Sequence, residues 1–283
     1  MHKLSKDTFI YAMSAANEPA LRVEPGARIQ FETWDALHGQ VKAGGDGDNE
    51  LDWNRVNPAT GPVYINGAQP GDILSVKIER IDVAQTGVVM CATGLKTVAI
   101  ENGVAHFSES IQLPLNKMIG VIGVAPKDGE ISNGVPDLHG GNMDCKEIRE
   151  GATVLLPVNA PGALLAIGDL HAVMADGEVC MTGVEVAGNV TVTVDIIRGK
   201  DLPLPMVIND THVITVASDA DLDIAVDMAV ANMQNYLTKT EGFTVEDAIM
   251  LTSLVADVRI CQIVDPKKTA RVEFPKKYLR KAP

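Results

Sequence analysis

The strongest constraint on the fold of this chain lies in its first two thirds, where short Val-rich apolar runs alternate with turns rich in Gly, Pro, Asn and Asp. Runs of this kind are typical of β-strands, and many short strands at this spacing predict a sandwich or a barrel. No long segment before about residue 218 has the period of a helix. We expect strands at residues 28–33, 73–81, 153–158, 163–174, 179–186 and 190–197.

The last third of the chain has helical periodicity. Apolar residues recur at helical spacing over 222–237, and Ser218 is the expected N-cap of that helix. A second helix is expected to begin at Thr244, where Asp247 follows three residues later as in a capping box. These patterns predict two helices near the C-terminus.

Two further strands are expected beside these helices. One covers residues 208–217, and the other covers residues 258–264 and reads as buried. We therefore expect a β-rich body over 1–205 that carries the motif loops, followed by an α+β unit over 206–283.

Composition excludes several classes of protein. The 283 residues include 24 Lys and Arg against 37 Asp and Glu, a formal net charge of −13, so we expect no nucleic-acid partner. A hydrophobic content of 46% argues against disorder. No apolar run approaches the ~20 residues of a membrane helix, so no membrane contact is expected. The polar first residues predict no signal peptide and a cytoplasmic protein.

The cysteines and the basic C-terminal segment indicate less about function than the overall composition does. The four cysteines are scattered without a Cys-x-x-Cys pair, so neither disulfides nor a cysteine zinc knuckle is expected. The basic residues of 267–281 predict a solvated tail or an ion-pairing surface between subunits. A closed homo-oligomer is the default expectation for a soluble enzyme.

The segment 168–178 is the richest in chemically useful side chains. Asp169 and His171 are two residues apart on an expected strand and so share one face. A carboxylate beside an imidazole suits metal binding or proton transfer. Glu178 either joins this chemistry or only completes a turn.

The position of Glu185 depends on the loop that precedes it. The Asp-Gly step at 176–177 predicts a hairpin. A two-residue turn would pair His171 with Thr182 and place Glu185 on the opposite face of the sheet. A three-residue loop would pair His171 with Met181 and place Glu185 on the same face, and the residues alone leave both arrangements open.

A second candidate segment is the sequence HGGNMDCK at 139–146. Its two glycines allow positive φ and could bring Asn142 and Asp144 close to a ligand. Asp144 is a good ligand for a hard metal, and Lys146 could hold a developing negative charge. The alternative is a polar surface loop.

Two acidic segments near the N-terminus are weaker candidates. Asp35 follows an expected strand and could cap the local backbone or bind a metal. The Gly-rich segment 42–54 suggests calcium through Asp46, Asp48 and Glu50. The Gly and Glu positions of an EF-hand hold other residues here, so a flexible loop is the default expectation.

Several common catalytic motifs are missing from the sequence. There is no Gly-x-Gly-x-x-Gly opening a helix, no Walker loop and no Gly-x-Ser-x-Gly elbow. No serine has the surroundings of a Ser-Lys amidase site, and Cys145 has Lys146 and Glu147 only as neighbours in sequence. These absences disfavour nucleotide binding and hydrolysis by a serine or cysteine nucleophile.

Motifs spread over most of the chain resemble those of the acetamidase/formamidase family, from about residue 20 to the C-terminal strand. In order they are FETWD at 31–35, GAQPGD at 67–72, HGGNMD at 139–144, GDLHA at 168–172, DGE at 176–178 and GVE at 183–185. Met174 and Ala175 stand where members of the family often carry Gln and Gly, which puts the substrate in doubt.

The resemblance implies both a fold and an activity. The implied fold is mainly β, a β-sandwich plus a small barrel-like β part, with an α+β C-terminal unit. The implied activity is metal-dependent hydrolysis of a short-chain amide, such as formamide or acetamide, to a carboxylate and ammonia.

From the motifs and this resemblance we expect a metal centre with adjoining catalytic groups. The expected metal ligands are Asp144 and His171, helped by Asp35 or Asp169. Glu185 is the expected general base, and the residues expected to stabilise the oxyanion are Lys146 and Asn142. The residues expected to contact substrate are His139, Gly141 and Glu178. Mixed nitrogen and oxygen ligands favour zinc, then calcium or magnesium.

Two other functions stay open at this level. The chain could be a non-catalytic small-ligand-binding or scaffold protein, since a fold does not determine function. It could also be a metal-dependent hydrolase of another small C–N or ester bond. The aromatic content of 4% favours a very small, polar substrate.

Overall fold

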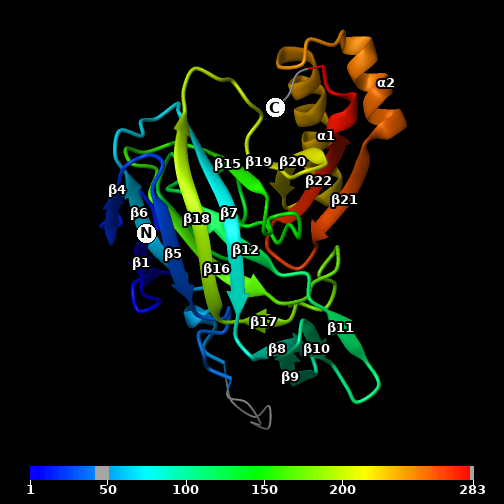
Figure 1. Ribbon diagram of the computed structural model, residues 1–283. Helices are drawn as coiled ribbons and strands as arrows, with labels where there is room; N and C mark the ends of the chain where they lie inside the picture. Colours follow the sequence, from blue (N-terminus) through cyan, green and yellow to red (C-terminus); the bar gives the residue numbers. More distant parts are fainter. Residues whose placement is uncertain (42–50, 281–283) are drawn as a thin grey trace.

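The computed structural model describes residues 1–41 and 51–280. Two large β-sheets pack face to face in the body of the molecule (Figure 1). The acidic residues Asp46, Asp48 and Glu50 of the suggested calcium loop lie outside the described residues. The mainly β fold expected from the sequence is confirmed.

The first sheet has nine strands and runs through the whole chain. In spatial order they are β1 (His2–Leu4), β5 (Arg28–Thr33), β18 (Gly188–Ile197), β7 (Ile73–Val83), β15 (Thr153–Pro157), β19 (Met206–Ile208), β20 (His212–Asp219), β22 (Lys268–Pro275) and β21 (Asp257–Gln262). Because β15 pairs with β19, strands of the expected C-terminal unit continue the sheet of the β body.

The second sheet carries the motif strands. Its main path is β11 (Gln112–Pro114), β10 (Val104–His106), β9 (Gly94–Glu101), β8 (Thr86–Cys91), β17 (Glu185–Val186), β16 (Leu165–His171), β12 (Met118–Gly123) and β14 (Gly140–Asn142). The strands off this path are β6 (Ala59–Ile65), β2 (Phe9–Ile10) and β4 (Leu21–Val23). A separate pair is formed by β3 (Ala12–Ser14) and β13 (Glu130–Ser132). The strand orders of both large sheets are open paths in the described residues.

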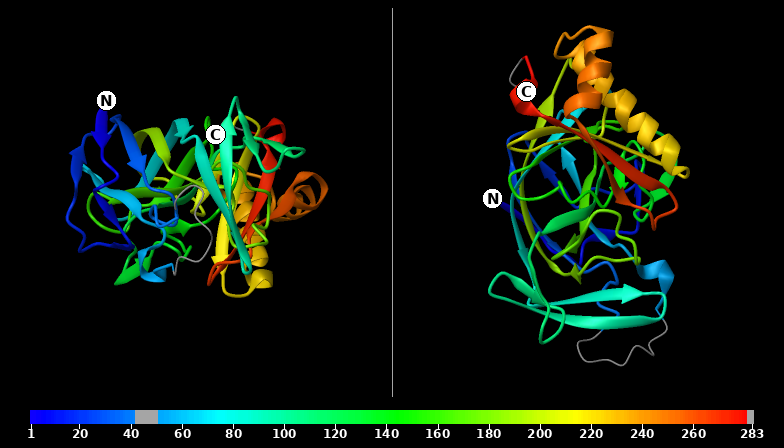
Figure 2. Two further views of the ribbon diagram at one scale, coloured as in Figure 1. Left: turned by 90° about the horizontal axis from the view of Figure 1, so that it is seen from below. Right: turned by 90° about the vertical axis from the view of Figure 1, so that its right-hand side faces the viewer.

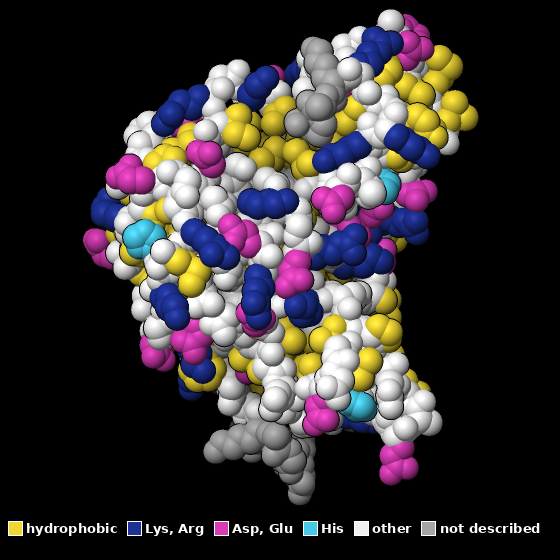
Figure 3. Space-filling view, viewed as in Figure 1, with side chains coloured by type: hydrophobic (Ala, Val, Ile, Leu, Met, Phe, Trp, Pro, Cys, Tyr) yellow, Lys and Arg dark blue, Asp and Glu magenta, His cyan; other side chains and the backbone are white. Residues whose placement is uncertain are grey.

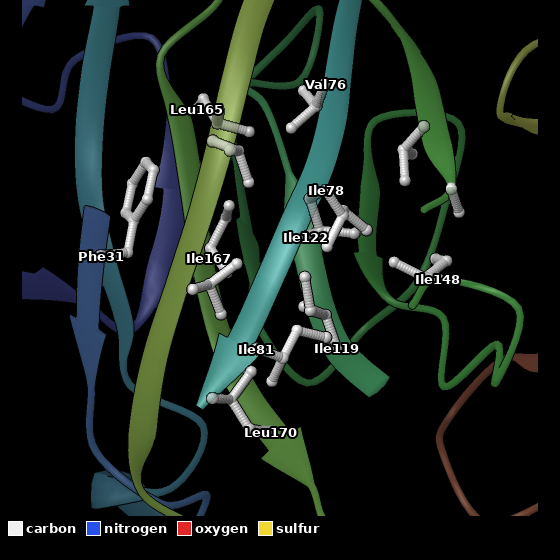
Figure 4. Close-up of a cluster of buried hydrophobic side chains, with 14 of the residues drawn as sticks. Phe31, Val76, Ile78, Ile81, Ile119, Ile122, Ile148, Leu165, Ile167 and Leu170 are labelled. Carbon is white, nitrogen blue, oxygen red and sulfur yellow. The ribbon is translucent and has the colours of Figure 1, made fainter. Parts of the chain in front are cut away.

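The core lies between the two sheets. Figure 4 shows Phe31 and Ile78 from the first sheet together with Ile122 and Ile167 from the second. All six residues of β12 are buried, as expected for a central strand with both faces covered. Each large apolar side chain in this core contributes about 1.5–3 kcal/mol by leaving water, so the inner faces hold the two sheets together.

The two helices cover one end of the first sheet (Figures 1 and 2). Helix α1 (Leu222–Lys239) packs Ala229 and Met233 against Val213 and Val272 of β20 and β22. Its N-cap is Asp221, whose side chain accepts from the amides of residues 223 and 224. The expected cap at residue 218 is therefore wrong, because that residue still belongs to β20.

Helix α2 (Val245–Val255) begins as expected. Thr244 caps it by accepting a hydrogen bond from the Asp247 amide at 3.1 Å. Apolar side chains stay exposed on α2, including Ile249, Met250 and Leu254, and hydrophobic atoms gather over this helix in Figure 3. A patch of this kind is typical of an interaction surface, and the homo-oligomer stays a prediction.

The strand after α2 differs from its prediction. The strand expected to be buried at 258–264 is β21, at the edge of its sheet, and its first four residues are exposed. Its apolar composition resembles that of a core strand, but its position at the edge decides the exposure. A short 3-10 turn, η2 (Lys276–Tyr278), follows β22. No helix of the described residues is long and apolar enough to span a bilayer.

Candidate functional site

The motif residues meet at one end of the second sheet. Asp169 and His171 come from β16, whose neighbours are β12 and β17. Asp144 is the second residue after β14, and Glu185 is the first residue of β17. Glu178 comes from the long segment between β16 and β17. The hydrogen-bonded ladder of these strands fixes the distances between the side chains.

The imidazole of His171 is the centre of this cluster. Its Nε2 lies 3.1 Å from Glu185 Oε1 and 3.2 Å from Asp169 Oδ1. The same nitrogen lies 3.8 Å from Asp144 Oδ1 and 3.8 Å from Glu178 Oε1. All five side chains are buried. One nitrogen therefore faces four carboxylate groups in a region with little water.

The second ring nitrogen of His171 has a different neighbour. Nδ1 lies 3.2 Å from the sulfur of Met174, the residue that departs from the usual family pattern. A thioether is a weak acceptor. When Nδ1 carries the proton and donates to this sulfur, the lone pair of Nε2 points to the carboxylates.

The hairpin predicted at 176–177 is wrong. Segment 172–184 is a long excursion, and His171 pairs directly with Glu185. Neither predicted partner of His171, Thr182 or Met181, is correct. Direct cross-strand partners point to the same face of a sheet, so Glu185 lies on the same face as His171. Neither the two-residue nor the three-residue loop predicted this direct pairing.

The Asp-Gly step makes a tertiary contact in place of a hairpin turn. The Gly177 amide donates to the Cys261 carbonyl at 2.9 Å, and the Ile263 amide donates to the Gly177 carbonyl at 3.1 Å. These two bonds attach the segment that carries Glu178 to β21, far along the sequence. The strand expected at 179–186 is accordingly reduced to β17.

A buried cation from the C-terminal strands holds the same segment. Arg271 of β22 is 1% exposed and contacts both carboxylate oxygens of Asp176, at 2.7 and 3.0 Å. Its Nε also donates to Glu273 at 2.7 Å. Because Asp176 is two residues from Glu178, this bidentate pair restrains the approach of Glu178 to the cluster.

The cluster strongly perturbs protonation. Burial and the Asp169 carboxylate raise the pKa of Asp144 well above its usual range. Burial and Asp144 raise the pKa of Glu178 to about 10. Burial opposes the charged form of His171, but Glu185 and Asp169 raise its pKa overall. The adjacent imidazole lowers the pKa of Asp169 despite its burial.

The cluster fits a divalent metal. Four ligand atoms at zinc–ligand distances of 2.0–2.2 Å in a tetrahedron lie about 3.3–3.6 Å apart, close to the 3.1–3.8 Å separations measured from Nε2. Among the described residues, two groups of potential ligands have their ligand atoms within 4.8 Å of one another, Asp144–His171–Glu178 and Asp169–His171–Glu185. Both oxygens of Asp144 and Glu185 Oε2 are buried without a donor in the described residues. Buried carboxylate oxygens of this kind need a cation or a proton.

Two glycines make room for these side chains. A Cβ on Gly120 of β12 would overlap carboxylate oxygens of both Asp169 and Asp144. A Cβ on Gly183 would lie 2.8 Å from His171 Nδ1. Glycine is therefore required at both positions for steric reasons.

Four of the five cluster residues, all except Asp144, line the floor of a cavity of about 390 Å³. The lining residues of the floor are Asn142, Asp169, His171, Glu178, Glu185 and Asp265. Asp265 was not predicted as a site residue, since in the sequence it only ends a strand. Its Oδ2 is buried without a donor in the described residues, and burial and Glu178 raise its pKa to about 8. Only the packing of β21 against the site reveals it.

Two predicted site residues have other partners. Asp35 accepts hydrogen bonds from the amides of Leu37 and Gly39 and belongs to neither ligand group of the described residues. The Lys146 ammonium lies 2.9 Å from an oxygen of Asp176, and Lys146 is not among the residues that line the cavity.

Two other predicted residues lie beside the cavity. His139 is buried, and burial lowers its pKa to about 4, so the ring is neutral. Gly141 has φ +85°, and a Cβ there would lie 2.5 Å from the Val135 carbonyl oxygen. Neither lines the cavity, whereas Asn142, the residue after Gly141, does.

Comparison with known proteins agrees with the motif resemblance. A family model described as the acetamidase/formamidase family matches residues 16–113 and 128–279. The structure of an acetamidase from Bacillus halodurans is 42% identical, with a TM-score of 0.95 and 98% of each chain covered. A predicted acetamidase/formamidase from Thermoanaerobacter tengcongensis is 45% identical, with a TM-score of 0.95 and coverage of 98% of this chain and 96% of that chain.

The chain matches only part of a curated relative. A formamidase of Methylophilus methylotrophus is 26% identical over an alignment of 256 residues, and the match covers 62% of this chain and 61% of that protein. The chain thus matches less than two thirds of the length of that formamidase.

Gly120→Ala tests the steric requirement at the cluster. The added methyl should push Asp144 and Asp169 apart and weaken binding of Zn²⁺ to metal-free protein at least ~10-fold, about 1.4 kcal/mol, by isothermal titration. Gly94→Ala on β9 is the control, because a Cβ there meets nothing within 4 Å. Equal zinc affinity in the two variants would contradict the assignment.

Arg271→Met tests the buried ion pair. Loss of the guanidinium leaves Asp176 with Lys146 alone and removes the Arg271 partner of Glu273. The free energy of unfolding should fall by about 2–3 kcal/mol in urea, less than for a fully buried pair because water reaches both carboxylates. Arg259→Met on the neighbouring strand removes an exposed pair with Asp257 and should change stability by less than about 0.5 kcal/mol. Similar losses in both variants would show that Arg271 has no special role.

Proposed function

The chain belongs to the acetamidase/formamidase family, and from this premise we propose that it hydrolyses small amides of the formamide and acetamide type to a carboxylate and ammonia. The observation that carries the proposal is the placement of one imidazole among four buried carboxylates, three of which line the floor of a cavity together with it. A purely structural cluster would have no reason to lie open to a ligand. Perturbed ionisable groups in a cavity are typical of catalytic sites.

We further propose that the cluster holds a divalent cation, with zinc as the first choice and calcium or magnesium as alternatives. The proposed ligands are His171 Nε2 and the carboxylates of Asp144 and Glu178, which form one of the two ligand groups, with Asp169 from the other group as the fourth. When bound, such an ion would polarise the amide carbonyl and make a water acidic enough to attack at neutral pH. The unpartnered oxygens of Asp144 support this arrangement.

Glu185 is the proposed general base. One of its oxygens is turned to His171, and the other has no donor among the described residues and is available to a water. The free oxygen would take the proton of the attacking water and return it to the leaving nitrogen as the C–N bond breaks. A carboxylate in a dry site is a stronger base than one in water, because burial disfavours its charged form.

Asn142 is the proposed donor to the oxyanion. It lines the cavity beside the cluster, and its amide carries two N–H donors that need no change of charge. Lys146 is left out of the mechanism because its ammonium pairs with Asp176. Asp35 is left out because its carboxylate caps the backbone of its own loop. His139 and Gly141 are proposed to shape the loop that presents Asn142.

Metal content and ammonia release together test the proposal. Purified protein should contain about one divalent ion per chain and release ammonia from formamide and acetamide. Asp144→Ala and His171→Ala should lose most of both, since each removes a proposed ligand. Full metal content and full turnover in these two variants would overturn the site assignment. Bound metal with no turnover of any amide or ester would favour the ligand-binding alternative.

Glu185→Gln tests the general base separately. The substitution preserves shape and removes the basic oxygen, so kcat should fall about 10²–10⁴-fold while KM and metal content change little. Glu101→Gln, at an exposed position at the end of β9, should leave kcat unchanged. An unchanged kcat in Glu185→Gln would assign the base to another carboxylate.

A further inference from the structure

The cavity is much larger than formamide or acetamide. Its volume is about 390 Å³. Acetamide has four non-hydrogen atoms and occupies roughly 100 Å³, if each takes about the share of a water molecule in the liquid. Cavities of 300–1,000 Å³ are typical of sites for ligands of more than a dozen atoms. Most of the space is therefore unused by the smallest amides.

The walls of this space differ from its floor. The floor is polar, as described above, whereas apolar side chains from separate parts of the chain line the walls. The apolar wall residues include Leu37, Trp53, Val56, Met90, Met181 and Val264, and the polar side chains of Asn57, Ser132 and Thr182 also line this space. A polar group that reacts on the floor would therefore place any attached chain against apolar surface.

The charge of the cavity limits the substrate further. In the described part of the chain neither Lys nor Arg lines it, while four carboxylates do. A substrate with a carboxylate at its far end would leave that charge beside apolar walls with no partner. The two methionines, Met90 and Met181, can adjust to chains of different shape. The cavity thus suits a neutral, flexible or flat apolar group.

We propose that the preferred substrates are neutral primary amides whose acyl group carries about four to eight carbon atoms, rather than formamide or acetamide. The inference rests on the proposed amide hydrolysis at the same site. The reaction is unchanged: a C–O bond forms from water, the C–N bond breaks, and the proton passes to the leaving ammonia. The acyl chain lies along Met90, Met181 and Val264, and the carbonyl lies at the floor.

The expected increase in kcat/KM with chain length comes from transfer of the acyl chain from water to these apolar walls. Each buried methylene strengthens binding about fourfold. Because the walls contact the chain in both the ground state and the transition state, the gain appears in kcat/KM. Butyramide, with two more methylenes than acetamide, should therefore exceed it in kcat/KM about 15-fold.

A substrate series tests the inference. We would measure kcat/KM for ammonia release from formamide, acetamide, butyramide, hexanamide, benzamide and succinamate with the metal-loaded protein. The expected result is a rise from formamide to hexanamide, turnover of benzamide, and at least a tenfold deficit of succinamate against butyramide. A fall in kcat/KM from acetamide to butyramide would overturn the inference while leaving the proposed function intact. No ammonia from any amide would instead overturn the proposed function.

A substitution in the cavity wall tests whether the acyl chain contacts Met181. Met181→Ala should lower the ratio of kcat/KM for hexanamide to that for acetamide about fivefold, because the chain loses one apolar contact. Val179→Ala is the matched control, since residue 179 lies on the same segment, is 76% exposed and does not line this cavity. An unchanged ratio in Met181→Ala would show that the acyl chain does not lie along this wall.

Discussion

The arrangement of this protein depends on holding several carboxylates close together in a place that water barely reaches. Like charges at 3–4 Å repel strongly where the dielectric is low, so side chains left to themselves would separate. The β-ladder prevents this. His171 is fixed opposite Glu185 by backbone pairing, and Asp144 follows a short strand bonded to β12. The folding energy of the sandwich core thus maintains an arrangement that is unfavourable until a cation or protons neutralise it.

The C-terminal unit is part of the site as well as of the sheet. Arg271 binds Asp176, the backbone of Gly177 bonds to residues on either side of the end of β21, and Asp265 lies on the cavity floor. An ion pair and two backbone hydrogen bonds therefore connect β21, β22 and the residue after β21 to the segment that carries Glu178. A movement of these strands would shift Glu178 relative to His171. The expected β body and the expected α+β unit therefore both contribute residues that position the cluster around His171.

Two predictions of local structure, the hairpin at 176–177 and the helix cap at Ser218, are wrong for the same physical reason. The Asp-Gly step at 176–177 is a good hairpin signal, but its amide and carbonyl bond to residues 261 and 263 instead. Ser218 is a good N-cap residue, but pairing with β22 keeps it in a strand. In both cases hydrogen bonds to distant residues satisfy the backbone better than the local turn or cap. The cap at Thr244 agreed with its prediction, because its side chain accepts a hydrogen bond from the Asp247 amide three residues later.

The polarity of the cavity walls could not be predicted from amino-acid composition. The low aromatic content favoured a very small polar substrate, yet the cavity walls are apolar without many rings. Leu37, Val56, Met90 and Val264 provide that surface from four separate segments. Composition does not show which aliphatic side chains the fold turns away from the core. Their convergence is a property of the assembled sheets.

The amino-acid sequence by itself determined the mainly β class, the two C-terminal helices and the pairing of Asp169 with His171 on one face, because each follows from periodicity over a few neighbouring residues. Its motifs also indicated Asp144, Glu178 and Glu185 as chemically important. Only the tertiary structure decided that these side chains surround one nitrogen, that Asp265 joins them and that Lys146 and Asp35 are engaged elsewhere. The reason is physical: distances between segments far apart in sequence depend on strand order and register, which no local pattern contains.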